Sequence, residues 1–306
     1  MPTNKQKAHN KRLKDQRARI NAAKEYPDTL YLEKVGEQEE YHLVGQPHAV
    51  EGMAEPVKVN LTLLDAETEE PIFQRISPTS LDKQLAANKS AKEGLELYER
   101  AQTHHREDQS RGHMHLGFWS EMGNPKYNMS RHTTHNQHAL PLLNWARKHS
   151  DLYLSTLYPL IHEDWQAHLD TRKDSMAWLR DFMQDQVAVL PDWWSTCTFF
   201  NTTTPGVHQD QKDQIPSFLF NFGAPTIVRL RDYGVDIQLD HLDVVIFNTS
   251  NFHSTYSPDQ DLQGRWAFSA FMRKVFYEKQ PPHNLSQARI DSEVEEPTWR
   301  IRGANV

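Results

Sequence analysis

The chain changes its pattern of apolar residues near Pro191, and this change limits its possible folds more than any other feature. Between residues 140 and 187, apolar side chains recur every three or four positions, a spacing typical of helices that bury one face. After Pro191, short runs rich in Phe, Val, Ile and Thr alternate with turn residues. The predicted strands are 196–201, 217–221, 226–231, 235–239, 244–248 and 265–275. Helices followed by many strands predict an α+β fold, with a double-stranded β-helix (jelly-roll) core and a helical layer from the N-terminal half packed on it.

The same patterns divide the chain into four segments around one domain. We expect a basic, flexible N-terminal arm at 1–40, a mixed, mainly helical support region at 41–190, the jelly-roll core at 191–280 and a polar C-terminal tail at 281–306. Helices are predicted at 80–102, with Ser80 as the cap, and at 140–148, 151–169 and 174–187. Pro159 should end or kink the helix at 151–169, because its ring removes a hydrogen bond from the ladder.

Composition indicates a globular protein of a reducing, intracellular compartment. The single cysteine, Cys197, excludes an internal disulfide framework and a multi-cysteine zinc site. No run approaches the roughly 20 apolar residues that span a bilayer, so we expect no membrane association. The net charge is −7, yet residues 1–19 carry seven basic residues against Asp15 alone. Such an arm suits nuclear import or phosphate contact, or is simply a solvated tail.

Three residues of the strand-rich half form a candidate metal site. His208 and Asp210 are two apart near a predicted strand end, so both side chains project from one face. His253, from a later strand, would complete a set of two imidazoles and one carboxylate. Such a set leaves three coordination positions open, two for a chelating keto acid and one for dioxygen, and it suits Fe(II) better than a closed zinc site.

Arg265 follows His253 by twelve residues and begins the predicted strand 265–273. Alternation along this strand places Arg265, Ser269, Phe271 and Arg273 on one side and Trp266, Phe268 and Met272 on the other. A guanidinium that points into a barrel matches the distal carboxylate of 2-oxoglutarate, to which Ser269 would add a hydrogen bond. The alternative is an internal ion pair between Arg265 and an aspartate.

Other histidines offer weaker metal sites. His132, His135 and His138 have helical spacing, but no carboxylate or cysteine lies nearby in the sequence, so we expect surface or cap roles for them. His113 and His115 also form a ligand-rich pair, whereas His241 falls in a predicted turn. A structural zinc protein built on these histidines is a further alternative.

The segments 208–213 and 217–223, the strand 243–247, His253 and Arg265 resemble the TET/JBP family of nucleic-acid base oxygenases, and in particular its compact protist and fungal members. The resemblance extends over residues 199–274. The features that are more specific to this family than the metal triad are Asp213, the phenylalanine-containing strand that leads to Gly223, and Phe271 six residues after Arg265.

This resemblance implies that His208, Asp210 and His253 bind the iron and that Arg265 anchors 2-oxoglutarate. It also implies that Asp213 and Phe271 hold an extruded methylated base, by accepting from an exocyclic amine and by stacking.

Some members have a histidine that touches the base at the position of Arg273, which is another candidate substrate contact here. An arginine can only donate, so it would serve an acceptor ring nitrogen or carbonyl of the base, or bind phosphate instead. Some members also have a basic residue just before the first iron ligand, which 205–207 lack. The base and the second cosubstrate contact therefore stay open. Asn124 is a further candidate base contact.

The predicted function is an Fe(II)- and 2-oxoglutarate-dependent dioxygenase that uses O2 to oxidise a methyl group on a nucleic-acid base. The first candidate base is 5-methylcytosine, and the second is N6-methyladenine. We expect the nucleic acid to be DNA rather than RNA. The expected location is the nucleus. One alternative keeps the chemistry but acts on a protein side chain or a small metabolite, which the acidic net charge favours. Another is a non-catalytic nucleic-acid-binding protein on the same fold.

Overall fold

A computed structural model of the chain describes residues 5–7, 10–11, 14, 28–36, 39–47, 58–77, 84–103, 113–119, 128–183, 190–201, 206–257 and 264–274. The N-terminal arm lies largely outside these residues, and Asn124, Ser80 and the tail at 281–306 lie wholly outside them. Among the helices of the described part, none is long and apolar enough to cross a membrane.

A large sheet of nine strands forms the centre of the molecule, in the order β1-β3-β4-β11-β8-β13-β7-β5-β6. Its strands are β1 (Asp28–Leu32), β3 (Leu61–Asp65), β4 (Pro71–Ile76), β5 (His113–Trp119), β6 (Asn128–Met129), β7 (Thr196–Asn201), β8 (Asp213–Gly223), β11 (Val244–Phe247) and β13 (Arg265–Arg273). β13 lies between β7 and β8 and is antiparallel to both. Strands from three of the four predicted segments thus join one sheet, and β1 belongs to the stretch that we expected to be a flexible arm.

A smaller sheet of four strands covers one face of the large sheet. Its order is β12-β9-β10-β2, formed by β12 (His253–Tyr256), β9 (Thr226–Leu230), β10 (Val235–Leu239) and β2 (His42–Val44). Buried side chains of both sheets form one apolar cluster, which includes Phe73 and Val245 of the large sheet and Val228 and Ile237 of the small one. Two sheets that enclose a core in this way confirm the predicted jelly roll.

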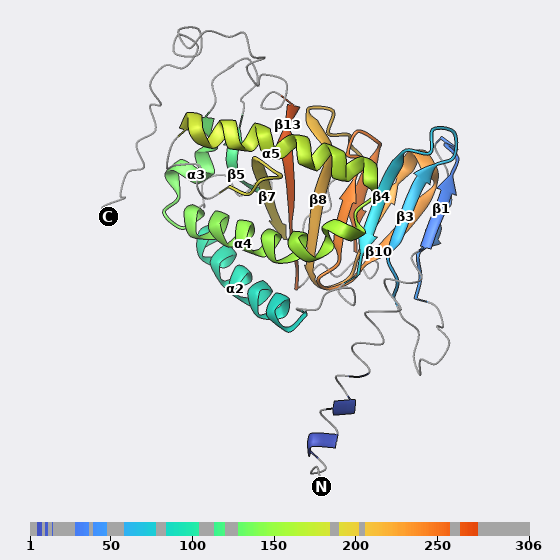
Figure 1. Cartoon of the computed structure of the whole chain (residues 1–306), viewed down its shortest axis with the longest axis horizontal. Coiled ribbons are helices and arrows are strands. Elements are labelled where there is room, and N and C mark those ends of the chain that lie inside the picture. Colours follow the sequence, from blue (N-terminus) through green and yellow to red (C-terminus); the bar gives the residue numbers. More distant parts are fainter. Residues whose placement is uncertain are drawn as a thin grey trace.

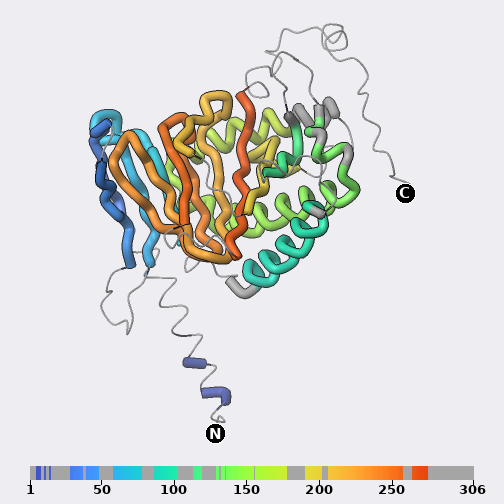
Figure 2. Tube along the Cα trace, turned by 180° about the vertical axis from the view of Figure 1, so that it is seen from behind, coloured from blue at the N-terminus to red at the C-terminus, as the bar shows by residue number. Residues whose placement is uncertain are grey.

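Helices cover the opposite face of the large sheet. They are α2 (Gln84–Thr103), α3 (Arg131–His135), α4 (Ala139–Leu157) and α5 (Glu163–Met183). Figure 1 shows α4 and α5 running across the sheet with α2 beside α4, and Figure 2 shows the sheets from the other side. Trp145 of α4 packs against Trp266 and Phe268 of β13, with ring centroids 5.5 and 5.7 Å apart. The alternation of β13 is therefore as predicted, because Trp266, Phe268 and Met272 all join the core beneath the helices.

Several element boundaries differ from those predicted. α4 ends at Leu157 and a short 3-10 helix, Tyr158–Leu160, follows it, which confirms that Pro159 ends a helix. The predicted breaks near residues 149 and 172 are wrong, since α4 and α5 are continuous there. Ser150 and Arg172, the polar residues at these points, are fully buried and bonded to carbonyl groups. Such partners allow polar side chains to remain inside a helix.

Candidate metal centre and active site

His208, Asp210 and His253 come together at one end of the sandwich, as the sequence predicts. His208 and His253 form an antiparallel bridge in which each backbone N–H donates to the carbonyl of the other at 3.0 Å. The backbone N–H of Asp210 donates to Thr249 at 2.8 Å, which fixes the carboxylate beside both rings. One ligand atom from each residue lies within 4.8 Å of the others. Asp210 Oδ2 is 3.9 Å from His208 Nε2 and 3.8 Å from His253 Nε2.

Both imidazoles are held in the orientation that a metal requires. Nδ1 of His208 lies 2.8 Å from the carbonyl of Gly206, and Nδ1 of His253 lies 2.9 Å from that of Asn251. A carbonyl only accepts, so each Nδ1 carries the proton and each Nε2 presents its lone pair to the common centre. Burial lowers the pKa of His253, which favours the neutral, metal-binding form.

The donor set fits a catalytic metal better than a structural one. The side chains of His208 and Asp210 are 39% and 40% exposed, whereas that of His253 is 6% exposed. The centre is thus open on one side and protected on the other. Two imidazoles and one carboxylate with open positions are typical of Fe(II) oxygen chemistry.

A cavity of about 250 Å³ leads from this centre into the sandwich. Both sheets contribute to its wall, which includes the three ligands and the predicted substrate and cosubstrate residues Asp213, Ser269, Phe271 and Arg273. The remaining wall combines apolar residues (Phe200, Leu219 and Phe247) with small polar ones (Thr198, Ser217, Thr249 and Thr255) and two histidines (His113 and His115). Such a mixture of apolar surface with a few polar groups is usual for a small-molecule site.

Asp213 and Arg273 form an ion pair inside this cavity. They are directly opposite each other where β8 begins and β13 ends, and Arg273 Nη1 donates to Asp213 Oδ1 at 2.7 Å. The side chains are only 4% and 15% exposed. Burial raises the pKa of Asp213 to about 7, against the opposing effect of the Arg273 charge. The two predicted base contacts therefore act as one unit rather than separately.

Arg265 lies at the other end of β13, beside the cavity rather than in its wall. Its residue exposure is 2%, and its guanidinium carbon lies 5.6 Å from the ring centroid of Phe200, which does line the cavity. Burial lowers the pKa of Arg265 to about 10, so the group still carries its charge at neutral pH. Gly223 is paired with it, and a Cβ there would lie 1.8 Å from the carbonyl oxygen of Gly264. Glycine is thus required for β8 and β13 to close around Arg265.

His113 and His115 are site residues whose place in the cavity the sequence analysis missed. They alternate along β5, so both face the cavity from the strand next to β7. His115 Nδ1 is hydrogen-bonded to Thr198 Oγ1 at 2.8 Å, and the His115 ring stacks on His132. Burial and its charged neighbours lower the pKa of His115 to about 4, so the ring is neutral at pH 7. The i, i+2 spacing was the available signal, but nothing in the sequence marked 113–119 as a strand.

Of the other histidines singled out in the sequence, His132, His138 and His241 have supporting positions, and the side chain of His135 lies outside the part that the structure describes. His132 Nδ1 accepts the backbone N–H of His115 at 2.8 Å, and His138 is the N-cap residue of α4. His241 lies in the turn before β11. Its Nδ1 accepts the backbone N–H of Gly223 at 2.9 Å, and its Nε2 lies 2.9 Å from Oδ1 of Asn88 on α2. It does not belong to the metal triad, in agreement with the prediction.

Comparisons with known proteins support the fold. No protein-family model matches the chain, and no curated protein matches it. Among solved structures, the chain is similar to NgTET1 in complex with 5mC DNA, with 13% sequence identity, a TM-score of 0.53 and coverage of 87% of this chain and 90% of that one. A ribosomal oxygenase from Escherichia coli, YcfD, solved with cobalt and 2-oxoglutarate, matches over 32% of this chain and 27% of its own, with 19% identity and a TM-score of 0.21.

The likeness to NgTET1 extends over most of both chains, so it defines the fold. The chain thus has a jelly-roll fold similar to that of NgTET1, and its described residues include a His–Asp–His triad at the mouth of the cavity.

Proposed function

We propose that the protein is an Fe(II)- and 2-oxoglutarate-dependent dioxygenase whose metal is held by His208, Asp210 and His253. The observation that carries this proposal is the geometry of the triad. Both Nδ1 atoms are committed to backbone carbonyls, so the two Nε2 atoms and the Asp210 carboxylate face one point at the entrance of the cavity. When bound, iron and 2-oxoglutarate reduce O2 and deliver one oxygen atom to succinate and the other to a substrate C–H bond, with release of CO2.

The protein's own residues position the reactants. Arg265 supplies a buried positive charge beside Phe200 for the distal carboxylate of 2-oxoglutarate, and Ser269 lies two residues before Phe271 on the same face of β13. Phe247 packs edge-on against His253 with ring centroids 5.2 Å apart, which keeps water from that side of the His253 imidazole. The exposed sides of His208 and Asp210 leave the approach to the metal open for substrate.

We further propose that the substrate is a methyl group on a nucleic-acid base, with 5-methylcytosine in DNA the first candidate and N6-methyladenine the second. The Asp213–Arg273 pair offers an acceptor beside a donor, which suits the amino and ring-nitrogen edge that both bases share. Phe271 lies between this pair and Ser269 in the cavity wall and provides an aromatic face. The protein of similar fold, NgTET1, was solved with 5mC DNA.

The test is turnover of methylated oligonucleotides. We expect that protein, Fe(II), 2-oxoglutarate and O2 convert 5-methylcytosine to its hydroxymethyl form, or N6-methyladenine to adenine and formaldehyde, as measured by nucleoside mass spectrometry. His208→Ala and Asp210→Ala should abolish turnover. Absence of any product from either base would reject the nucleic-acid proposal, whereas succinate formation with another substrate would retain the oxygenase.

The second candidate function is oxidation of a protein side chain or a small metabolite by the same centre. The net charge of −7 favours it, because phosphate-binding proteins usually present an excess of positive charge. Duplex binding that weakens as salt is raised distinguishes the two. A non-catalytic binding protein would instead keep its biological activity after His208→Ala.

Nuclear localisation, suggested by the basic arm, is part of the nucleic-acid proposal and is checked by imaging a tagged chain.

A further inference from the structure

The strand β1 forms an open edge of the large sheet. It is the longest of the edge strands that the structure describes, with five residues against two in β6, three in β2 and four in β12. Figures 1 and 2 show it as the outermost strand at one end of the sandwich. Its sequence, Asp28-Thr29-Leu30-Tyr31-Leu32, has no proline or lysine, the residues that commonly block such an edge.

The pairing of β1 with β3 shows which of its backbone groups face outward. The N–H of Asp28 donates to the carbonyl just before β3 at 2.7 Å, and the carbonyl of Leu32 accepts from the N–H just after β3 at 2.9 Å. Successive residues of a strand direct these groups to opposite sides, so Asp28, Leu30 and Leu32 bond β3. Thr29 and Tyr31 therefore present their N–H and C=O groups on the outer side, where no described strand pairs with β1.

The side chains of β1 leave apolar surface at the same edge. Tyr31 is 59% exposed and Leu30 is 36% exposed, whereas Leu32 packs against the apolar cluster between the two sheets. An apolar edge strand with outward backbone groups favours pairing with a strand of another chain. Such a strand would bond the backbone of β1 and cover Leu30 at the same time.

The sequence around Tyr31 is complementary to its own reverse. Leu30 and Leu32 stand on either side of Tyr31, and Asp28 and Lys34 lie three residues away on either side. When two copies pair antiparallel with Tyr31 at the centre, Leu30 lies opposite the partner's Leu32 and Asp28 lies opposite the partner's Lys34. Each contact occurs twice, because the arrangement is two-fold symmetric. The two Tyr31 backbones bond each other, and the other pairs take the positions where side chains approach most closely.

Lys34 is available for this contact. It follows β1 in an exposed stretch, and its side chain is 63% exposed. Its Nζ lies 3.8 Å from Asp65 Oδ2, and such a long contact of an exposed lysine contributes little. Asp65 has closer partners, because it accepts from the Tyr233 hydroxyl at 2.9 Å and from the backbone N–H groups of residues 67 and 68 at 3.0 Å. Lys34 thus loses little when it turns towards Asp28 of a second copy.

We propose that β1 is a self-association surface, at which two copies of this chain pair antiparallel about a two-fold axis at Tyr31. The charge match between Asp28 and Lys34 selects a second copy over an unrelated strand. The interface is one strand wide, so the dimer is weak, with a Kd on the order of 10–100 µM. No residue of β1 lines the cavity, so pairing at this edge does not close the metal centre. The inference is independent of the proposed function.

Tyr31→Pro tests the backbone pairing. Proline removes the outward N–H at the two-fold axis, and the bonds of Leu30 and Leu32 to β3 do not involve that N–H. Sedimentation velocity of the full chain over a concentration series, up to about 500 µM, gives the Kd. We expect the wild type to dimerise and Tyr31→Pro to raise the Kd roughly 10-fold, because two backbone hydrogen bonds are lost. Tyr31→Phe is the matched control, since it keeps the N–H and the ring, and it should dimerise like the wild type.

Charge variants test the register, and they serve as the second test if Tyr31→Pro does not fold. In Lys34→Asp two aspartates face each other, and in Asp28→Lys two lysines do. Each variant alone should self-associate about 10-fold more weakly, since two attractive pairs become repulsive. An equimolar mixture should recover the wild-type affinity, because each chain then offers the charge that the other lacks. The matched controls Lys89→Asp and Glu93→Lys make the same changes of charge at exposed positions of α2 and should each dimerise like the wild type.

Three results would overturn the inference. A wild-type chain that stays monomeric throughout the concentration series has no such surface and leaves the edge to a strand of a different protein. A dimer that persists in Tyr31→Pro and in both charge variants is formed elsewhere on the molecule. Charge variants that remain weak in the mixture show that Asp28 and Lys34 do not face each other across a two-fold axis. None of these measurements uses 2-oxoglutarate or a nucleic acid, so the inference fails or holds separately from the proposed function.

Discussion

Asp213 and Arg273 form a charged pair in a cavity that shields both from water. Each group is stable there because the other is present, since a buried carboxylate or guanidinium without a partner is strongly destabilised. We expect Arg273→Met to lower the free energy of unfolding by about 3 kcal/mol, because it leaves the Asp213 carboxylate buried next to an apolar side chain. Urea unfolding at pH 8 measures this difference.

The double variant Asp213→Asn, Arg273→Met provides the control for this pair. With the carboxylate replaced by a neutral amide, most of the lost stability should return, even though both native side chains are gone. Additive losses in the double variant would show that the two residues stabilise the protein independently of their contact at 2.7 Å.

His149 is a residue whose burial should make the protein sensitive to acid. It packs between Trp145 and Phe222, with ring centroids 4.9 and 5.1 Å away, and its Nδ1 is hydrogen-bonded to Ser90 at 2.8 Å. Burial lowers its pKa from 6.5 to about 3. Below pH 6.5 the unfolded chain therefore binds a proton that the folded chain does not, so stability is full above this pH and falls as the pH decreases towards 3.

The size of this effect follows from the same shift. Between pH 7 and pH 5, His149 should remove about 2 kcal/mol of stability, at about 1.4 kcal/mol per pH unit below 6.5. His149→Phe should lose correspondingly less stability over this range in urea unfolding. The slope will not vanish, because the pKa of His115 is lowered to about 4 by the same mechanism. An unchanged slope in the variant would contradict the assignment.

At the scale of the elements, Arg172 joins the helical layer to the strand that carries Asp213. This arginine of α5 is fully buried, and its guanidinium donates to the carbonyls of Gln214 and Pro216 on β8 and of Trp193 before β7. We expect Arg172→Met to lower the free energy of unfolding by about 3 kcal/mol, because these carbonyls lose their donor in a buried place. Thermal unfolding tests it, and Arg147→Met on α4, at a half-buried position, should cost less than half as much.

The strands that the sequence predicted well are short runs rich in β-branched or aromatic residues between turn residues. β7 and β10 match their predicted bounds, because Thr196–Asn201 is rich in Thr and Phe, Val235–Leu239 carries Val, Ile and Leu, and turn residues follow both runs. β4 was not predicted, since Gln74 and Arg75 interrupt its apolar run although both are buried, so it shows neither a continuous apolar run nor an alternation. β5 was not predicted either, because His113-Met114-His115 gives no apolar pattern until the strand is paired with β7. Local sequence patterns cannot report burial that depends on a distant partner.

At the scale of the whole molecule, the cavity depends on contacts that are distant in sequence. The triad and Arg265 could be predicted because their chemistry and spacing are local to 208–265. The place of the β5 histidines in the cavity and the contact between Asp213 and Arg273 could not, because each depends on which strands become neighbours. The sequence therefore predicts the reaction centre better than it predicts the surfaces that receive the substrate and cosubstrate.

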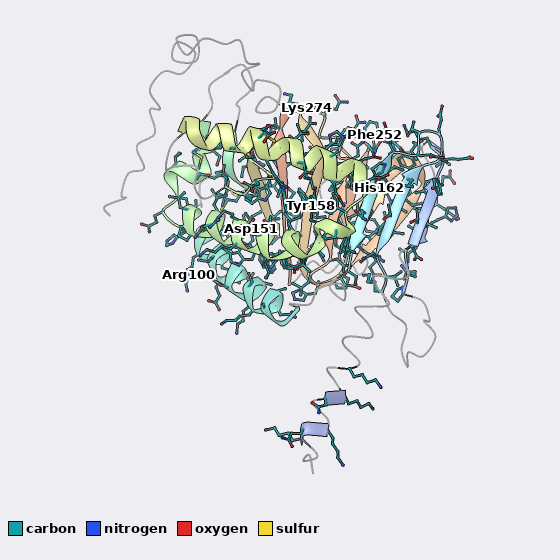
Figure 3. All side chains as sticks on the ribbon, in the orientation of Figure 1. Arg100, Asp151, Tyr158, His162, Phe252 and Lys274 are labelled. Carbon is teal, nitrogen blue, oxygen red and sulfur yellow. The ribbon has the colours of Figure 1, made fainter. Side chains whose placement is uncertain are left out.

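The distribution of charge around the open end leads to a prediction for nucleic-acid binding. Lys212 and Lys274 meet where β8 begins and β13 ends, with the backbone N–H of Lys274 bonded to the carbonyl of Lys212 at 2.9 Å. Figure 3 shows Lys274 and Phe252 on the same edge of the molecule, and Phe252, which is 38% exposed, directly precedes the ligand His253. This edge thus offers cationic and aromatic groups beside the metal centre, although the chain as a whole is acidic.

If a phosphate backbone approaches at this edge, Lys212→Glu with Lys274→Glu should weaken duplex binding at least 10-fold at moderate salt and reduce the slope of log K against log salt by about one per lysine. The matched control is Lys89→Glu with Lys92→Glu on the exposed side of α2, which makes the same change of net charge away from Lys274. Fluorescence anisotropy with a methylated duplex at several salt concentrations measures both. Equal weakening by the two pairs would show that only the net charge matters, whereas no weakening by either would favour the protein or metabolite substrate.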